Sequence, residues 1–223
     1  MAYILNIDTA LKKASVSVSL KGKIISVACN DTTLDHAAFL HTAIDKVLQQ
    51  AALSIKEIQA VSVVYGPGSY TGLRIGMASA KGLCFALQVP LIGIGTLALM
   101  AASMIRVLPE SQQEYLLFPM IDARRMEVFT AGYNQKLEEI MPARALILDN
   151  HSFLDLPQNS TPVFFGDGAQ KWEPICTVSN ALFTELSPLQ NDLAEMSYKK
   201  FLSGNFTELA YSEPLYVKSF YTK

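Results

Sequence analysis

The fold of this chain is decided by the stretch Tyr65-Gly66-Pro67-Gly68-Ser69-Tyr70-Thr71-Gly72-Leu73-Arg74-Ile75-Gly76. An apolar, β-branched run at 60–64 precedes it and predicts a buried strand. The residues from 75 to 87 follow it and predict a helix that ends before Pro90. The glycines suit a tight turn, and Ser69 or Thr71 is a suitable N-cap for the helix. The stretch therefore predicts a strand–loop–helix unit of an α/β fold, at the kind of loop where ligands and partners dock.

Two well-known glycine loops do not match this spacing. The dinucleotide-binding pattern G-x-G-x-x-G would need its third glycine one residue before Gly72. A Walker loop would need a lysine where Leu73 follows that glycine. An isolated Gly-Pro-Gly has a simpler interpretation, in which the glycines only build a turn.

The run from Gly66 to Gly76 closely resembles the signature of the TsaB (YeaZ) family. Weaker similarities are Asp122-Ala123-Arg124 followed by Glu127-Val128-Phe129, where Phe129 replaces a more usual Tyr, and the closing segment 213–218. The resemblance spans nearly the whole chain. It implies a dimerising, non-catalytic subunit of the bacterial machinery that makes threonylcarbamoyladenosine in tRNA.

The N-terminal residues resemble a second, broader group. Runs at 3–9, 14–20 and 24–28 predict three antiparallel strands. The first of these strands ends in Asp8-Thr9. Together the three strands resemble the first lobe of the actin, sugar-kinase and heat-shock chaperone superfamily, which implies a two-lobed, actin-like α/β fold. In that superfamily the acid and hydroxyl lie beside nucleotide phosphates, so the resemblance makes Asp8 and Thr9 vestigial phosphate-binding residues. The usual glycine after the acid is absent, and an acid that only fixes the turn is the alternative.

The polar stretch at 109–114 predicts the boundary between two lobes. Residues 1–108 would form the N-terminal actin-like lobe and residues 109–223 a reduced C-terminal lobe. Strands are expected in the second lobe at 115–122, 127–133, 145–148 and 162–165, followed by a helix at 189–202. This lobe lacks the double-glycine adenosine loop expected of a complete kinase-like lobe.

Two neighbouring helices suggest a docking surface. One is expected from about His36 to Leu53, with Asp35 as its cap and an apolar stripe along it. The helix after the glycine loop contains Gly76 and Gly82, and an internal glycine costs up to ~1 kcal/mol relative to alanine. Such glycines indicate close approach to the sheet or to another subunit. The family resemblance favours another subunit and predicts a partner interface made of Leu40, Ile44, Val47, Tyr70, Leu73, Arg74, Gly76, Met77 and Ala80.

The composition narrows the classes of function. Charged residues make up 17% of the chain and the formal net charge is −2, whereas a free-standing nucleic-acid-binding domain is normally basic. Cys29, Cys84 and Cys176 show no C-x-x-C spacing, which indicates reduced thiols in a cytosolic protein. No signal peptide or membrane-spanning run is expected, so the predicted location is the cytoplasm.

The resemblance also implies a set of partners. These are a TsaD-like catalytic subunit that transfers threonylcarbamoyl to adenosine 37 of tRNA, a TsaE-like ATPase in a larger complex, and a homodimer in isolation. It implies contact with tRNA mainly through the complex, no membrane contact, and no catalytic or metal-binding residues. No tightly bound cofactor is expected, with ATP or ADP and any metal on partner subunits. The helix at 96–108 lacks the metal-binding histidines of the catalytic relative.

Two enzymatic alternatives remain open. The first is a small nucleotide-dependent phosphotransferase that uses Asp8 and Thr9 near phosphates and Asp122 near a metal. The second is a TsaD-like transferase that acts alone.

Overall fold

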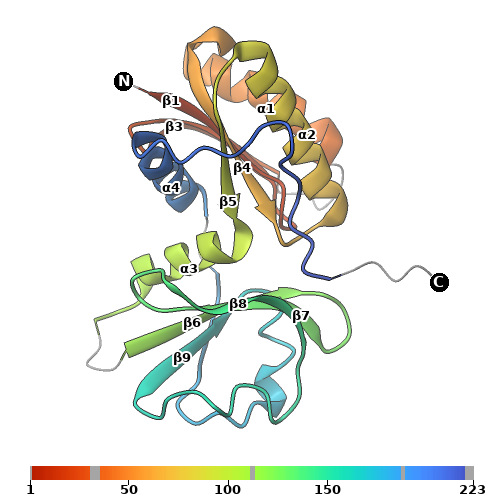
Figure 1. The fold of residues 1–223 in the computed structure, drawn as a ribbon, viewed down its shortest axis with the longest axis vertical. Helices are drawn as coiled ribbons and strands as arrows, with labels where there is room; N and C mark the ends of the chain where they lie inside the picture. Colours follow the sequence, from red (N-terminus) through yellow and green to blue (C-terminus); the bar gives the residue numbers. More distant parts are fainter. Residues whose placement is uncertain (1, 31–35, 111–113, 187–188, 219–223) are drawn as a thin grey trace, which may run out of the picture. The chain divides into compact units, whose positions relative to one another are not determined.

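A computed structural model describes residues 2–30, 36–110, 114–186 and 189–218. Within these residues the chain forms two five-stranded sheets with helices around them (Figure 1). The chain divides into two compact units. The first contains residues 1–96 and 189–215, and the second contains residues 97–188 and 216–223.

The sheet of the first unit has the strand order β3-β2-β1-β4-β5. Its strands are β1 (Tyr3–Asp8), β2 (Ser15–Leu20), β3 (Lys23–Cys29), β4 (Ile58–Gly66) and β5 (Leu91–Gly95). The β1–β2–β3 pairs are antiparallel, whereas β4 is parallel to both β1 and β5. A short 3₁₀ helix, η1 (Ile55–Glu57), leads into β4.

Helices cover both faces of this first sheet. Helices α1 (His36–Gln50) and α2 (Tyr70–Leu87) pack on one face, and α4 (Gln190–Leu202) packs on the other (Figure 1). The α1–α2 side is apolar and includes Leu5, Val18 and Val63. The α4 side is polar but buried: Asn6 Nδ2 donates to Ser19 Oγ at 3.0 Å, and Ser197 Oγ of α4 donates to Ser62 Oγ at 2.7 Å. This difference follows from the alternation of apolar and polar residues along β2 and along β1 from Leu5 to Asp8.

The second unit is built around the sheet β10-β9-β6-β7-β8. Its elements are α3 (Thr96–Val107), β6 (Glu114–Asp122), β7 (Glu127–Tyr133), β8 (Glu139–Ile147), β9 (Ser160–Phe165), η2 (Glu173–Ile175) and β10 (Leu182–Thr184). Its core is aromatic: the ring centroids of Phe164 and Trp172 are 4.8 Å apart, and Phe118 and Phe153 lie beside them. Trp172 Nε1 donates to the carbonyl of Asp149 at 2.9 Å, which satisfies the one polar atom of that buried ring.

The predicted two-sheet α/β fold is confirmed, and the start of α2 differs in detail. Helix α2 begins at Tyr70, five residues before the predicted start at Ile75, because the Ser69 side chain accepts a hydrogen bond from Gly72 N and caps the helix there. The predicted cap of α1, Asp35, lies outside the described residues.

The division of the chain also differs from the predicted boundary between residues 108 and 109. Residues 189–215 group with the first unit, because α4 packs on the first sheet and the segment after it pairs with β5. Thr207 N donates to Leu91 O at 2.8 Å, and Gly93 N donates to Thr207 Oγ1 at 2.8 Å. The C-terminal segment therefore completes the first unit at the edge of its sheet.

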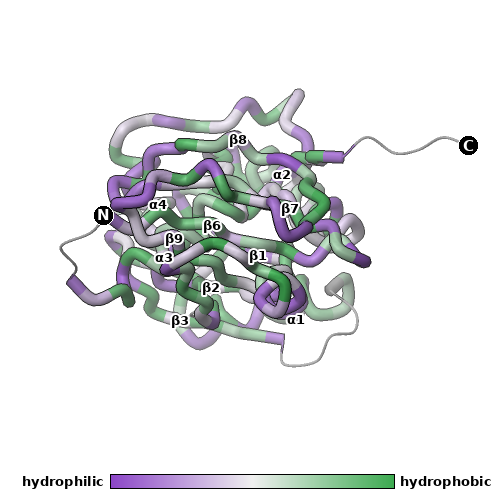
Figure 2. Tube along the Cα trace, turned by 90° about the horizontal axis from the view of Figure 1, so that it is seen from below, coloured by the Kyte–Doolittle hydropathy of each residue, from purple (hydrophilic) through white to green (hydrophobic). Residues whose placement is uncertain are grey.

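Hydropathy follows this layered arrangement. Green, hydrophobic segments run through the interior, and purple, hydrophilic residues concentrate in turns and on helix surfaces (Figure 2). No helix in the described part of the chain combines the length and apolar character needed to cross a bilayer.

Candidate functional site

The glycine loop between β4 and α2 is held by two other segments of the first unit. Ser69 N donates to Ala10 O at 2.7 Å, and Thr9 Oγ1 donates to Gly72 O at 2.7 Å. On the other side, Leu215 N donates to Tyr65 O at 2.8 Å. A Cβ atom at Gly68 would overlap the Ala10 backbone, and one at Gly76 would overlap Thr9 Oγ1. The loop therefore needs these glycines in order to approach the end of β1 this closely.

Asp8 and Thr9 meet this loop from the end of β1. The Asp8 side chain is buried and accepts a hydrogen bond from Ala10 N at 3.0 Å. Burial raises the pKa of Asp8 from 3.8 to about 6, and the bond to Ala10 opposes that shift. Both side chains thus bond to nearby backbone, as expected if the acid fixes the turn. Their contact with a phosphate stays a prediction.

Most of the predicted partner interface lies inside the first unit, which corrects that prediction. The residues that are buried in the unit's own interior are Leu40, Ile44, Val47, Leu73, Gly76, Met77 and Ala80. The apolar stripes of α1 and α2 cover the first sheet, whose α1–α2 face is itself apolar. The sequence pattern correctly predicted that these helix faces are buried. The prediction that another subunit covers them was wrong, because the first sheet covers them.

Tyr70 and Arg74, the other two predicted interface residues, are exposed at the start of α2. The guanidinium carbon of Arg74 lies 4.0 Å from the centroid of the Tyr70 ring, a cation–π arrangement. Further along the same side of the helix, Phe85 is 71% exposed, and no atom of the residues that the structure describes lies within 4 Å of a Cβ atom placed on Gly82. We call this surface the outward face of α2; it consists of Tyr70, Arg74, Ala78, Gly82, Phe85 and Ala86.

Sequence reasoning missed three members of this outward face, namely Ala78, Phe85 and Ala86. The sequence signal that could have found them is their spacing: each lies three or four residues along the helix from Arg74 or Gly82, and therefore on the same side. Next to α2, helix α1 exposes residues that are mostly small or polar: Ala37, Ala38, His41, Thr42, Asp45 and Lys46.

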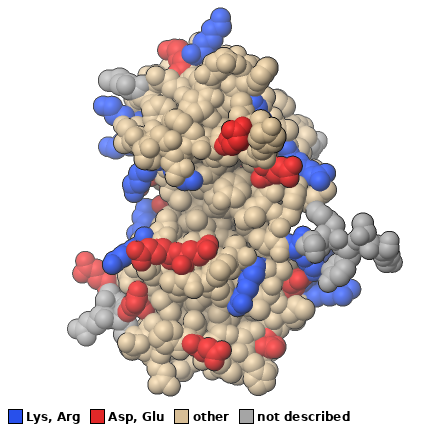
Figure 3. Space-filling view, in the orientation of Figure 1, with Lys and Arg blue, Asp and Glu red and all other residues tan. Residues whose placement is uncertain are grey.

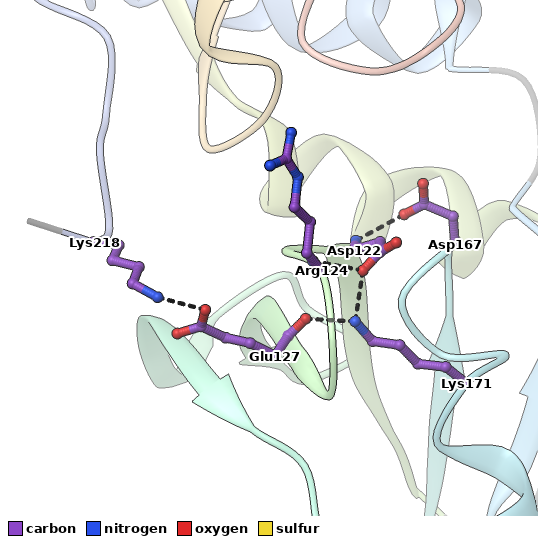
Figure 4. Close-up of polar contacts among 6 residues, drawn as sticks. All are labelled: Asp122, Arg124, Glu127, Asp167, Lys171 and Lys218. Atoms are coloured by element: carbon purple, nitrogen blue, oxygen red, sulfur yellow. Dashed lines mark hydrogen bonds and ion pairs between the residues drawn. The ribbon is translucent and has the colours of Figure 1, made fainter. Parts of the chain in front are cut away.

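A second group of polar residues surrounds the β6–β7 turn in the second unit (Figure 4). Asp122 Oδ1 accepts hydrogen bonds from Arg124 N at 2.8 Å and from Lys171 Nζ at 2.5 Å. Asp122 N donates to Asp167 Oδ1 at 2.9 Å, and Lys171 Nζ also donates to the carbonyl of Glu127 at 2.6 Å. Asp122 therefore anchors the turn through its side chain and its backbone N–H.

Metal-ligating side chains and thiols complete the inventory of reactive groups. Over the residues that the structure describes, no group of three or more His, Cys, Asp or Glu side chains is arranged to hold a metal ion. Cys29, Cys84 and Cys176 are free thiols, and burial raises the pKa of Cys84 to about 11. On the face drawn in Figure 3, acidic and basic side chains lie singly or in small groups, separated by wide uncharged areas.

Comparison with known proteins places this geometry in a family. Residues 27–164 match the family model described as TsaD: tRNA N6-adenosine threonylcarbamoyltransferase. The Escherichia coli tRNA threonylcarbamoyladenosine biosynthesis protein TsaB is 27% identical over 97% of this chain and 94% of its own length. A solved structure titled YeaZ from Pseudomonas aeruginosa aligns over 97% of this chain and 100% of its own, with a TM-score of 0.78 and 25% identity. The chain belongs to the TsaB (YeaZ) family.

The wider TsaB-family neighbourhood agrees with the actin-like fold. The Bacillus subtilis protein named TsaB is 28% identical over 73% of this chain and 69% of its own length. The activator of 2-hydroxyisocaproyl-CoA dehydratase from Clostridium difficile, solved with bound ADPNP, aligns over 92% of this chain and 96% of its own, with a TM-score of 0.51 and 8% identity. At that identity the likeness concerns the fold alone, and it confirms the predicted actin-like class.

Proposed function

We propose that this TsaB-family chain is a non-catalytic subunit that binds a TsaD-like catalytic subunit. In that role it supports the transfer of threonylcarbamoyl to adenosine 37 of tRNA. The proposal is supported by the two relatives named as tRNA threonylcarbamoyladenosine biosynthesis proteins and by the match to the TsaD family model. Two subunits with related folds can pair through equivalent helices, in the manner of an isologous dimer.

The observation that carries the proposal is the outward face of α2. Gly82 is exposed inside the helix, where a glycine costs up to ~1 kcal/mol relative to alanine, and no contact with the described residues of the first unit offsets that cost. Phe85 leaves most of its ring in water, although burial of a phenylalanine side chain contributes ~1.5–3 kcal/mol. A second helix packed along this face would approach closely at Gly82 and bury Phe85. Tyr70 and Arg74, on the same face, are residue types that often dominate binding energies.

The same proposal assigns no bond chemistry to the chain. The buried carboxyl of Asp8 and the hydroxyl of Thr9 bond to the backbone of their own unit, and Asp122 is paired with Lys171. The contribution of the chain is a binding free energy that favours one conformation of its partner. ATP or ADP and any metal would then lie on partner subunits, with a TsaE-like ATPase joining the cytoplasmic complex. In isolation the outward face of α2 would pair with a second copy.

Reconstitution tests this function directly. Purified chain is mixed with a TsaD-like subunit, a TsaE-like ATPase, tRNA and threonylcarbamoyl-adenylate, and each component is omitted in turn. Modified adenosine and ATP hydrolysis are measured in every mixture. We expect product only when the TsaD-like subunit is present, and much less product when this chain is left out.

Two outcomes of the same assay count against the proposal. Equal product with and without this chain would contradict a supporting role. ATP turnover by the isolated chain in the presence of Mg²⁺ would contradict the non-catalytic assignment and favour the phosphotransferase alternative, with Asp8 and Thr9 at the phosphates. Loss of that turnover in Asp8→Asn would then identify the site.

A further inference from the structure

We propose that the turn formed by Arg124 and Arg125 binds the phosphate backbone of RNA. The turn joins β6 to β7 in the second unit and lies beside the anchoring residue Asp122 (Figure 4). This inference rests on the proposed function, since it assigns part of the tRNA contact to this chain rather than to its partner. It concerns a different surface from the outward face of α2.

The backbone conformation of the turn is unfavourable for the two arginines that adopt it. Arg124 has φ = 71° and Arg125 has φ = 50°, so two consecutive side-chain-bearing residues adopt the left-handed conformation. Asparagine and glycine tolerate positive φ far better than arginine does, so they are the residues that such a backbone favours. Arginines at both positions are therefore not explained by turn formation. Six other non-glycine residues in the described part of the chain also have positive φ, but Arg124 and Arg125 are the two that are consecutive. Unfavourable conformations of this kind occur at functional sites, where the side chain is needed for another reason.

The surrounding structure holds this turn in place. Arg124 N donates to Asp122 Oδ1 at 2.8 Å, and Glu127 N donates to Arg124 O at 3.1 Å. Ala123 N donates to Glu127 O at 3.0 Å and closes the end of the hairpin. The two arginine side chains therefore project from a fixed backbone, which reduces the entropy lost when they bind a ligand.

Two of the three acids beside the turn have lysine partners, and the third, Asp167, accepts from Asp122 N. Lys171 Nζ lies 2.5 Å from Asp122 Oδ1, and Lys218 Nζ lies 2.6 Å from Glu127 Oε2. Arg124 and Arg125 are both exposed, and among the ion pairs of the described residues none involves either guanidinium. Figure 4 shows the Arg124 side chain extending away from Asp122, Glu127 and Lys171. With Asp122, Glu127 and Asp167 set against Lys171, Lys218 and the two arginines, the group keeps a net positive charge, and the arginines carry it.

Phosphate suits this arrangement for two reasons. A guanidinium presents a planar fork of donors that matches a phosphate in bidentate geometry, and arginine stays charged at any physiological pH. A chain with a net charge of −2 cannot attract RNA over its whole surface, so a local pair of rigidly held arginines would act as an anchor within a complex. The competing ligand is an acidic surface of a partner protein, and the experiment below separates the two.

The test compares wild type with R124N/R125G. Each protein is combined with the TsaD-like subunit. The affinity of the complex for unmodified tRNA is then measured at salt concentrations from about 50 to about 200 mM. Asn-Gly suits the backbone of the turn, so we expect the variant to have a Tm at least equal to that of wild type. We also expect a roughly tenfold weaker tRNA affinity near physiological salt, and a slope of log affinity against log salt that is smaller by about 1.5.

Two further variants sharpen the test. R124K/R125K keeps both charges without the bidentate fork, so its salt slope should match wild type while its affinity falls several-fold; this variant remains informative whatever the stability of R124N/R125G. R144N is the matched control, because Arg144 is also exposed in the second unit, on β8. Its tRNA affinity and salt slope should equal those of wild type.

Three results would overturn the inference. The first is an unchanged tRNA affinity and salt slope in R124N/R125G, and the second is an equal loss of tRNA affinity in R144N. The third is weaker binding of R124N/R125G to the TsaD-like subunit in the absence of RNA, which would indicate an acidic protein ligand. These failures are distinct from failure of the proposed function. If wild type supports no tRNA modification, the proposed function fails; if R124N/R125G supports modification with the KM of wild type, only this inference fails.

Discussion

Gly76 and Gly82 lie six residues apart on α2 and differ completely in their surroundings. Gly76 is buried against the Thr9 hydroxyl, where any side chain would overlap, whereas a side chain at Gly82 would point into open space. The first glycine is explained by the fold of the first unit, and the second is not. The comparison shows that the two faces of α2 have different roles. The inward face, which includes Gly76, packs in the core of the first unit, and the outward face, which includes Gly82, is available to a partner.

A substitution on the inward face of α2, at Gly76, should have the largest effect on stability. Gly76→Leu would force a side chain into the Thr9 contact and break the Thr9–Gly72 hydrogen bond, so we expect a loss of about 4 kcal/mol in the free energy of unfolding. Urea denaturation measures this loss, with Gly82→Leu as the control at a change below ~1 kcal/mol. If both variants unfolded at the same urea concentration, the distinction between the two faces would be lost.

Asp8 gives the next largest effect, because its carboxyl is buried on the inward side of the loop. The folded protein raises its pKa from 3.8 to about 6, so the folded state binds the proton more tightly than the unfolded state. The stabilising contribution of the proton is complete below pH 3.8, declines as the pH rises to about 6, and is absent at pH 7. The shift corresponds to about 3 kcal/mol.

Asp8→Asn removes this dependence while keeping an oxygen that accepts from Ala10 N. We therefore expect the variant to be more stable than wild type at pH 7 by up to about 3 kcal/mol, with a difference that shrinks toward pH 4. Thermal unfolding from pH 4 to pH 8 provides the measurement. A wild-type protein that gains stability relative to the variant as the pH rises would contradict the assignment.

The outward face should give the smallest change in stability. Gly82→Ala adds a methyl group that touches nothing in the first unit, so only helix propensity changes, and stability should rise by up to ~1 kcal/mol. Differential scanning calorimetry of the isolated chain at low concentration would register the gain. A fall in Tm under those conditions would mean that Gly82 already has a structural contact within the monomer.

Much of the fold was predictable from local pattern. Alternation in residues 14–20 and the apolar run before Gly66 located β2 and β4, and the three-to-four-residue spacing of Leu40, Ile44 and Val47 located the buried stripe of α1. Periodicity states that a helix face is covered, but it does not state what covers it. For this reason the sequence assigned that stripe to another subunit, although the first sheet covers it.

Other features depend on contacts between distant segments and were not predictable. The return of α4 and Thr207 to the first sheet joins residues more than a hundred positions apart, and no local pattern records that pairing. The raised pKa of Asp8 comes from the burial of its carboxyl, which no local sequence pattern around residue 8 records. The left-handed conformation of Arg124 and Arg125 was also missed, because sequence rules reserve such positions for asparagine and glycine.

The most direct test of the account is the affinity of the chain for a TsaD-like subunit, measured for Phe85→Asp and Leu202→Asp. Phe85 on α2 and Leu202 on α4 belong to the same unit and are 71% and 67% exposed, so the two changes should affect monomer stability about equally. Binding through the outward face of α2 predicts that Phe85→Asp weakens association more than tenfold, whereas Leu202→Asp binds like wild type. Equal affinity of the two variants, both folded, would contradict the claim that α2 is the docking helix.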